Sequence, residues 1–540
     1  MIVIHPRIYP FVWPDRTRTV EAFRVVDGRV VAMGSETTVL RERVPGEAVH
    51  RPDAACILPG LIDTHAHLSS LGARPGSLDV PDESTPAEIA AHVRRAVVGM
   101  PQGSWLTGRA WNQAVWPDGC EVERTPAGFP THRSLTEASP ATPVMLHRTD
   151  QHAVWLNRAA MEAAGLWRTR VPDPEGGTVD RDADGFPSGV LVDEAVGLVR
   201  KAMPPVTPTE RGLVVLERAR KFLEAGVTCV HCALVKPSAL PEYRNAVLGP
   251  DATGLRVRAM MYDHPEKLAE WARHNSPALG DDGVFHMVTL KAFADGALGS
   301  RGAWMYEPYV GTDGVGKPVA TPPEVELLAR TAVERGWQLA THAIGDRALR
   351  EVMEAYVRGG WNASLEPTLR FRIEHVQHTR PVDLDRMAEL RIAAPMQPIH
   401  ATRDMRYCDA LIGRERGANS YPWAGVLRRG IRLGFGSDYP IETLNPWAGL
   451  HAAVTRQDDR DLPAGGWNPE QCISMTQALD AYLASGASLV VADDGVLGSL
   501  ATTGDFIAID TDPFVDSART VAGTTVRATV VGGVVRHGGL

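Results

Sequence analysis

The chain has 540 residues, of which 44% are hydrophobic and 22% charged, and its formal net charge is −9. This is the composition of a globular protein long enough for more than one compact unit, and its acidic balance argues against nucleic acid or an anionic membrane as partner. Six cysteines are too few for a disulfide framework, and the absence of a recognisable signal peptide or long apolar span leads us to expect a soluble, cytoplasmic protein.

Both ends of the chain alternate short apolar runs with turns. Residues 21–34 predict two strands joined at Asp27-Gly28, a dipeptide typical of tight β-hairpins. The C-terminal end has a similar pattern, with a turn at Gly532-Gly533. Neither end has enough strands for a stable sheet alone, so we expect the two ends to share one small β-sandwich.

The middle of the chain alternates short apolar strands with helical stretches, such as residues 209–226 and 323–336. This alternation is typical of a parallel sheet, and eight units indicate an α/β fold with a closed (β/α)₈ barrel of the TIM type. The predicted strands are 58–68, 226–232, 255–263, 288–296, 338–346, 369–377, 391–398 and 431–438.

The stretch between the first two predicted strands is too long for a loop. We therefore expect an insert after the first barrel strand. The expected order is residues 1–56 in the sandwich, 57–75 with barrel strand 1, 76–208 in the insert, 209–489 in the rest of the barrel and 490–540 in the sandwich.

Chemistry-bearing residues recur at the ends of the predicted strands. His65 and His67 are two residues apart, so both side chains lie on one face at the C-terminal end of the first strand, where barrel enzymes carry out their chemistry. Lys291 lies inside an apolar strand, and a buried lysine is unusual unless it is paired or modified. Three further strand ends carry His342, His375 and Asp438. Imidazole with added carboxylate suits a metal such as zinc.

This series of His-x-His, Lys, His, His and Asp resembles the amidohydrolase superfamily. The surrounding segments resemble its YtcJ-like branch, amidohydrolase family 3, over nearly the whole chain. They are LPGLIDTHAHL, LKAFADGALGSRGA, THAIGDRAL, RIEHVQ, FGSDYPIETLNPWAGLHAAVTR and, in the insert, HRTDQHAVWLNRAAMEAAGL. The resemblance is specific for fold and metal chemistry and leaves the substrate open.

The resemblance also implies roles for these residues. Lys291 would be carbamylated by carbon dioxide and bridge two divalent ions, with zinc as the expected metal. His65, His67 and Asp438 would complete one metal site, and His342 and His375 the other. Two such ions lower the pKa of a bridging water and polarise the substrate carbonyl, while Asp438 acts first as general base and then as acid.

An unmodified Lys291 in an ion pair is the alternative. The site would then hold one metal, and His375 would polarise the substrate instead of binding a second ion.

Three residues are candidates for substrate contact, each with a structural alternative. His152 matches a histidine of the family but is equally a hydrogen-bonded loop residue. Arg301 follows Lys291 closely but is equally an ion-pair residue. Trp111 either lines an apolar pocket or belongs to the core of the insert. Cys229 and Cys232 form a CxxC pair, for which buried barrel thiols are favoured over a zinc or redox site.

The leading hypothesis is therefore a metal-dependent hydrolase of a carbon–nitrogen bond in a small molecule: an amide, N-formyl, carbamate or cyclic amide group. A mononuclear deaminase and a non-catalytic small-molecule-binding protein on the same fold are the alternatives. Metal stoichiometry separates the first two, and turnover separates both from the third. Similar proteins often form homodimers, and the sequence leaves the oligomeric state open.

Overall fold

The computed structural model describes residues 1–12, 15–69, 74–80, 84–111, 113, 116, 120–148, 153–174, 177–280 and 283–540. The chain forms two compact units, one of Met1–Ser69 with Val215–Leu540 and the other of Ser70–Val214. Within the described ranges, no helix combines the length and apolarity that crossing a bilayer requires.

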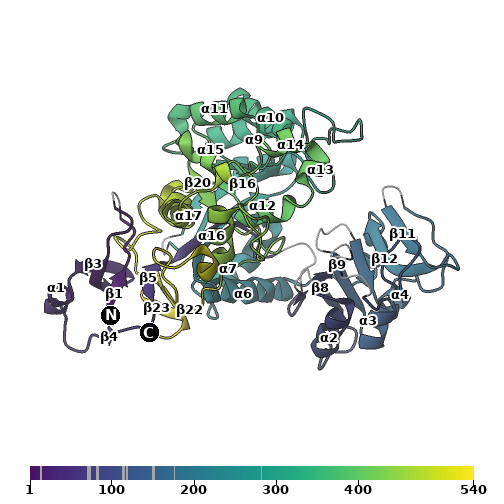
Figure 1. Cartoon of the computed structure of the whole chain (residues 1–540), viewed down its shortest axis with the longest axis horizontal. Helices are drawn as coiled ribbons and strands as arrows, with labels where there is room; N and C mark the ends of the chain where they lie inside the picture. Colours follow the sequence, from purple (N-terminus) through teal and green to yellow (C-terminus); the bar gives the residue numbers. More distant parts are fainter. Residues whose placement is uncertain are drawn as a thin grey trace. The chain divides into compact units, whose positions relative to one another are not determined.

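The two ends of the chain meet in one eight-stranded sheet of the first unit (Figure 1). Its strands are, in spatial order, β23 (Val534–Gly538), β22 (Val526–Val531), β21 (Phe506–Ile509), β5 (Cys56–Pro59), β1 (Ile2–Ile8), β2 (Val20–Val26) and β3 (Arg29–Gly34), with β4 (Val49–His50) beside β1. The N-terminal and C-terminal strands join where β5 pairs antiparallel with β21. The meeting of the two ends agrees with the sequence prediction, whereas a two-sheet sandwich is not confirmed.

Two tight hairpins shape this sheet. Asp27 and Gly28 connect β2 to β3 with φ values of 47° and 74°, and Gly532 and Gly533 connect β22 to β23 with φ values of 57° and 75°. Positive φ at both central residues is the geometry of a two-residue turn that follows the twist of the strands. Both turns predicted from the sequence are therefore confirmed.

Eight parallel strands form the centre of the first unit. They are β6 (Leu61–Ala66), β13 (Val227–Val235), β14 (Arg256–Tyr262), β16 (Phe285–Phe293), β17 (Gln338–Ala343), β18 (Arg372–His375), β19 (Ala394–Met396) and β20 (Leu433–Phe435). The first six are paired in this order, and β19 pairs with β20. Each of the eight predicted strands is present, although most are shorter than their apolar runs.

The eight strands close almost completely into a barrel. A bridge between Arg372 and Ala393 connects β18 to β19. At the other seam, Asp438 N donates to His65 O at 2.7 Å and His67 N donates to Tyr439 O at 2.8 Å, joining the end of β20 to the end of β6. The fold is a mixed α/β fold with a nearly closed parallel barrel.

Helices connect the barrel strands. α9, for example, begins where Glu324 accepts a hydrogen bond from Thr321 N at 2.7 Å and ends at Gly336, whose φ is 76°. α6 (Pro208–Glu224) begins in the second unit and ends in the first. The other helices of the first unit are α1 (Glu36–Arg41), α7 (Leu240–Leu248), α8 (Pro265–His274), α9 (Pro322–Arg335), α10 (Asp346–Arg358), α11 (Pro381–Glu389), α12 (Pro398–Asp404), α13 (Cys408–Ile412), α14 (Arg414–Gly417), α15 (Trp423–Arg428), α16 (Pro446–Thr455), α17 (Met475–Tyr482), α18 (Ala484–Ala487) and α19 (Ala518–Ala522).

The second unit has a sheet of its own. In spatial order its strands are β11 (Gly177–Arg181), β12 (Pro187–Asp193), β10 (Ala153–Leu156), β9 (Val144–Arg148), β8 (Leu106–Trp111) and β7 (Leu78–Asp79), with helices α2 (Pro86–Ala96), α3 (Arg133–Ala138), α4 (Arg158–Ala163) and α5 (Val196–Arg200). Trp111 is fully buried in its core, lies 6.0 Å from the ring of Trp155 and donates Nε1 to Leu146 O at 2.8 Å. Trp111 thus packs in the core of the second unit, and a substrate contact for this residue remains a prediction.

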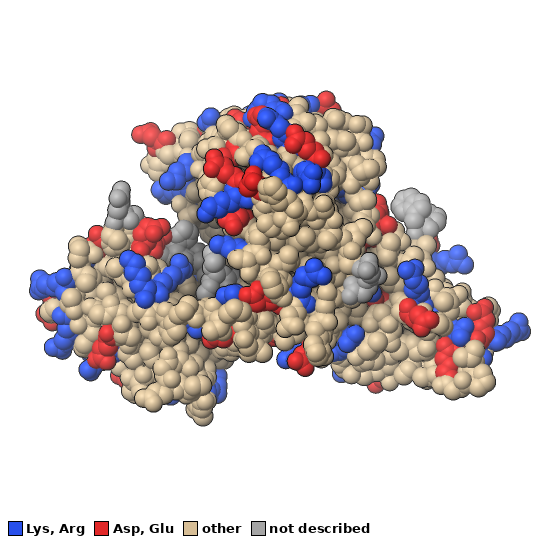
Figure 2. Space-filling model, turned by 180° about the vertical axis from the view of Figure 1, so that it is seen from behind, with Lys and Arg blue, Asp and Glu red and all other residues tan. Residues whose placement is uncertain are grey.

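The surface mixes both signs of charge. Figure 2 shows basic and acidic side chains interspersed over one face of the molecule.

Asp505 connects the sheet to the barrel, which generates a stability prediction. It accepts two hydrogen bonds from the Arg256 guanidinium, at 2.6 and 3.0 Å, and one from Gly532 N at 2.7 Å. Because Asp505→Ala removes the carboxylate partner of the largely buried Arg256 guanidinium, it should lower the free energy of unfolding, by at most about 3–5 kcal/mol, the cost of breaking a fully buried pair. The measurement is urea unfolding followed by circular dichroism. Glu270→Ala, which removes an exposed ion pair with Arg273, is the control and should leave the free energy of unfolding almost unchanged, because exposed ion pairs contribute little. Equal losses in the two variants would contradict the prediction.

Candidate metal centre

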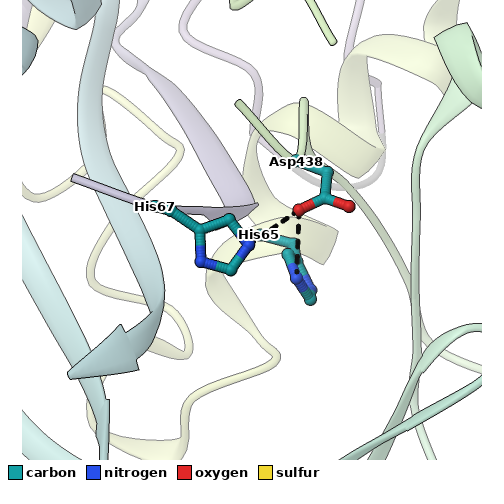
Figure 3. A group of neighbouring side chains, drawn as sticks. All are labelled: His65, His67 and Asp438. Atoms are coloured by element: carbon teal, nitrogen blue, oxygen red, sulfur yellow. Dashed lines mark hydrogen bonds and ion pairs between the residues drawn. The ribbon is translucent and has the colours of Figure 1, made fainter. Parts of the chain in front are cut away.

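The seam between β6 and β20 brings two histidines and an aspartate together. His65 lies near the end of β6, His67 directly after it, and Asp438 after β20. Figure 3 shows the two rings and the carboxylate pointing toward one another. Oδ1 of Asp438 lies 2.9 Å from His67 Nε2 and 3.5 Å from His65 Nε2.

A second group shares the same carboxylate. His400, on α12, lies with its Nε2 3.2 Å from Asp438 Oδ2. The ring of His375 lies 4.7 Å from the ring of His65 and 6.1 Å from that of His400. In each group, His65–His67–Asp438 and His375–His400–Asp438, the candidate ligand atoms lie within 4.8 Å of one another, which is the clustering a metal ion requires.

His342 and Lys291 complete the set predicted from the sequence. The His342 ring lies 4.5 Å from the His375 ring, and its Nε2 is 3.4 Å from Asp295 Oδ1 without hydrogen-bond geometry. Lys291 is fully buried on β16, and its Nζ lies 5.0 Å from the centre of the Phe293 ring. Among the described residues, Lys291 Nζ and His342 Nε2 have no hydrogen-bond partner.

The outer nitrogens of two histidines are fixed by acceptors. His65 Nδ1 is hydrogen-bonded to Glu374 Oε2, and His375 Nδ1 lies 2.8 Å from Gln397 Oε1. A carboxylate or amide oxygen accepts only, so Nδ1 carries the proton in both rings. The lone pair of each Nε2 therefore remains available for a metal.

The protonation states agree with this arrangement. Burial, assisted by the charge of Lys291, lowers the pKa of His65 to about 4, and burial together with His342 and His65 holds the pKa of His375 well below its usual range. Both rings are therefore neutral near pH 7, as metal ligands must be. Burial also lowers the pKa of Lys291 to about 8, which leaves part of the amine unprotonated near neutral pH.

Asp438 and His400 form the charged part of the cluster. Burial disfavours both charges. The neighbouring histidines nevertheless hold the pKa of Asp438 well below its usual range. Hydrogen bonds to Asp438 and Glu442 raise the pKa of His400 to about 10. Asp438 is thus an ionised carboxylate at neutral pH.

The backbone is unusual where these side chains are presented. His375, Val376 and Asp438 have φ values of 76°, 47° and 54°. A β-branched residue at positive φ is a genuine outlier, and such conformations cluster at functional sites. The turn at His375 also breaks the strand's alternation, so that Glu374 and His375 both contribute to the centre.

The residues fit a divalent metal. Four imidazoles, one carboxylate and a buried amine converge, and several of their buried nitrogens lack a partner within the described chain: His67 Nδ1, Lys291 Nζ and His342 Nε2. Such orphaned donors and acceptors are costly unless a ligand satisfies them.

A third cluster, Cys229, His231 and Asp493, is a weak metal candidate. Its atoms also lie within 4.8 Å of one another. However, Asp493 is already engaged by two hydrogen bonds from Arg258, at 2.5 and 2.7 Å. Burial raises the pKa of the Cys229 thiol to about 12, so it is protonated and a poor ligand. Cys232, the other half of the CxxC pair, is likewise a buried free thiol, which agrees with the structural reading.

The structure describes one of the two remaining substrate candidates, Arg301, and does not describe the other, His152. Arg301 is exposed in a turn after β16, where its backbone N donates to Leu298 O. His152 lies outside the described residues. A substrate role for either remains a prediction.

Three neighbours of the centre were missed from the sequence: Asp295, Glu374 and His400. Glu374 stands beside His375, where strand alternation points it to the opposite face. His400 follows a strand of only three residues and lies on a helix. Asp295 follows β16 and was the one with a usable signal, because it is an acidic residue at a strand end.

Comparison with known proteins extends these observations. Residues 55–537 match the model of a family described as the amidohydrolase family. The chain is 30% identical over 528 residues to Protein LONG AFTER FAR-RED 3 of Arabidopsis thaliana, covering 95% of this chain and 88% of that one. It is 28% identical over 536 residues to the putative amidohydrolase YtcJ of Bacillus subtilis (strain 168), covering 96% of each. It is 26% identical over 545 residues to the N-substituted formamide deformylase of Arthrobacter pascens, covering 97% and 96%.

Solved structures show the same fold. An uncharacterized metal-dependent hydrolase from Pyrococcus furiosus matches with a TM-score of 0.73 at 23% identity, over 95% of this chain and 99% of that one. One from Pyrococcus horikoshii matches with a TM-score of 0.74 at 22% identity, over 96% and 98%. Together with a histidine and aspartate cluster suited to a divalent metal, the family match means that the chain belongs to the amidohydrolase family, as a hydrolase of carbon–nitrogen bonds other than peptide bonds.

Proposed function

We propose that this chain is a binuclear zinc enzyme that hydrolyses an N-formyl or other small N-acyl group. The observation that carries the proposal is Lys291, a fully buried amine beside the histidine cluster with no hydrogen-bond partner among the described residues. A lysine in that position is costly as a bare ammonium. As a carbamate it is an anion with two oxygens for metals.

In this proposal six residues hold two zinc ions. One ion would be held by His65, His67 and Asp438 and the other by His342 and His375, and a carbamylated Lys291 would contribute an oxygen to each. When bound, two such ions lower the pKa of a shared water and polarise the substrate carbonyl.

The chain's own residues move the proton. Asp438 is ionised, so it can accept a proton from water and later donate it to the leaving amine. His400 holds Oδ2 of this carboxylate at 3.2 Å while Oδ1 faces His65 and His67. We propose that His400 thereby orients Asp438, which leaves one oxygen directed at the reaction.

The substrate class rests on similarity. The relative from Arthrobacter pascens is an N-substituted formamide deformylase and aligns over 97% of this chain. N-substituted formamides are therefore the first compounds to test, followed by amides, carbamates and cyclic amides. We also propose that the nearly closed barrel is a (β/α)₈ barrel of the TIM type and that residues 76–208 form a separate insert domain.

His67→Ala tests the function. We expect it to lose bound zinc and more than about 100-fold in formamide turnover, since even an outer partner of a ligand contributes about 10–100-fold. Zinc is measured by mass spectrometry and turnover by formate release.

The matched control is His451→Ala, whose imidazole is buried and, like that of His67, lies close to an aspartate, 3.0 Å from Asp461. It should retain both zinc and turnover. Full zinc content with unchanged turnover in His67→Ala would exclude the assignment, and a wild type with one zinc per chain and amine-deaminating activity would favour the mononuclear deaminase.

Lys291→Ala tests the bridging carbamate. It should lose most turnover because the anionic bridge disappears. Short carboxylic acids should partly restore Lys291→Ala, since an acid fits the space that the lysine vacates. They should not restore Lys291→Met, whose side chain fills that space. Wild-type turnover in Lys291→Ala would refute the binuclear proposal.

Carbamate formation should depend on pH in the metal-free protein. Only the neutral amine attacks carbon dioxide, and the pKa of Lys291 is lowered to about 8. Because the neutral form gains as pH rises through this value, the carbamate signal at fixed bicarbonate should grow between about pH 7 and 9, as seen by carbon-13 NMR with labelled bicarbonate. Lys291→Ala gives the baseline, and a wild-type signal that equals this baseline at every pH would contradict the proposal.

A further inference from the structure

A buried ion pair lies directly behind His65. Glu374 and Arg372 are both fully buried on β18, two residues apart. Arg372 donates to Glu374 Oε1 from Nε at 2.5 Å and to Oε2 from Nη2 at 3.1 Å. Oε2 also accepts the hydrogen bond from His65 Nδ1. The pair therefore connects the barrel interior to one of the proposed metal ligands.

Arg372 is itself held on two further sides. Its Nη2 donates to Thr64 O at 2.8 Å, and its Nη1 donates to Nδ1 of the fully buried His231 at 3.0 Å. Thr64 precedes His65 on β6, so the same guanidinium contacts the backbone beside this histidine and the carboxylate behind it. The orientation of Glu374 is thus fixed by β6, β13 and β18 together.

We propose that Glu374, oriented by Arg372, is a positioning residue that holds His65 with its Nε2 lone pair toward the metal centre and thereby sets the affinity for zinc. The inference rests on the proposed function, because it takes His65 as a metal ligand. A carboxylate that accepts from Nδ1 fixes the tautomer and the ring orientation, and it makes the other nitrogen a stronger donor. Gln397 likewise fixes the tautomer and the ring orientation of His375. Because its amide carries no charge, it does not strengthen the other nitrogen of His375 in the same way.

The competing explanation is a purely structural ion pair. The chain offers a matched example in Arg258 and Asp493, which are also joined by two hydrogen bonds, at 2.5 and 2.7 Å, and are also buried in the barrel unit. Asp493 contacts none of the six proposed metal-binding residues in any described hydrogen bond or ion pair. Removing its charge reproduces the structural cost without the effect on His65.

The experiment compares zinc affinity in Glu374→Gln and Asp493→Asn, both of which remove a charge and keep the shape. Zinc alone is titrated into metal-free protein in competition with a chromophoric chelator, and folding is checked by circular dichroism. We expect Glu374→Gln to bind zinc about 10–100-fold more weakly than wild type, and Asp493→Asn to bind zinc with an affinity close to that of wild type. Equal affinities in the two variants would overturn the proposal.

Arg372→Lys gives a second measurement if Glu374→Gln does not fold. It keeps the positive charge but cannot make the paired contact with Glu374, so zinc binding should again weaken, and unchanged affinity would count against the proposal. Different results would contradict the proposed function and the positioning role of Glu374. A wild type that binds no zinc contradicts the proposed function, whereas a wild type that binds zinc with an affinity matched by Glu374→Gln contradicts only the role of Glu374.

Discussion

The backbone hydrogen bonds that join β6 to the segment after β20 determine the geometry of the metal centre. Asp438 N donates to His65 O, and His67 N donates to Tyr439 O. Asp63 reinforces this seam, because its carboxylate accepts from His65 N at 3.0 Å and from Ser437 Oγ at 2.6 Å. The barrel therefore closes at the place where the two histidines and the aspartate must meet, and any opening of the seam would separate them.

The sequence predicts most of this centre because strand-end positions carry directional information. A His-x-His pair on a strand places two rings on one face, and parallel strands end at the same mouth. Those rules do not predict His400, because its position depends on where α12 begins. They also do not predict Glu374, because strand alternation places its side chain on the opposite face from that of His375. The positive φ of His375 removes that separation, and a backbone turn of this kind has no signature in one sequence.

The limits of prediction for the fold have a similar cause. Apolar runs identify the eight barrel strands, since parallel strands buried on both faces are continuously hydrophobic. The pairing of β5 with β21 joins residues about 450 positions apart, so only the shortage of strands at each end could suggest it. In the second unit, single strands such as β8 do not stand out from their Pro- and Gly-rich surroundings, and the sheet emerges only when six of them pair.

The polar interior of the barrel is better explained by function than by stability. Burying an ion pair costs desolvation that its attraction barely repays, and apolar residues of similar volume are often as stable or more so. Arg258 and Asp493 have a structural use, because Asp493 lies 235 residues further along the chain and their contact fastens that segment to the barrel. Arg372 and Glu374 are neighbours on one strand, so their contact joins no distant segments. What their burial does provide is a carboxylate, held in place by Arg372, that accepts a hydrogen bond from Nδ1 of His65, the histidine that we propose as a metal ligand.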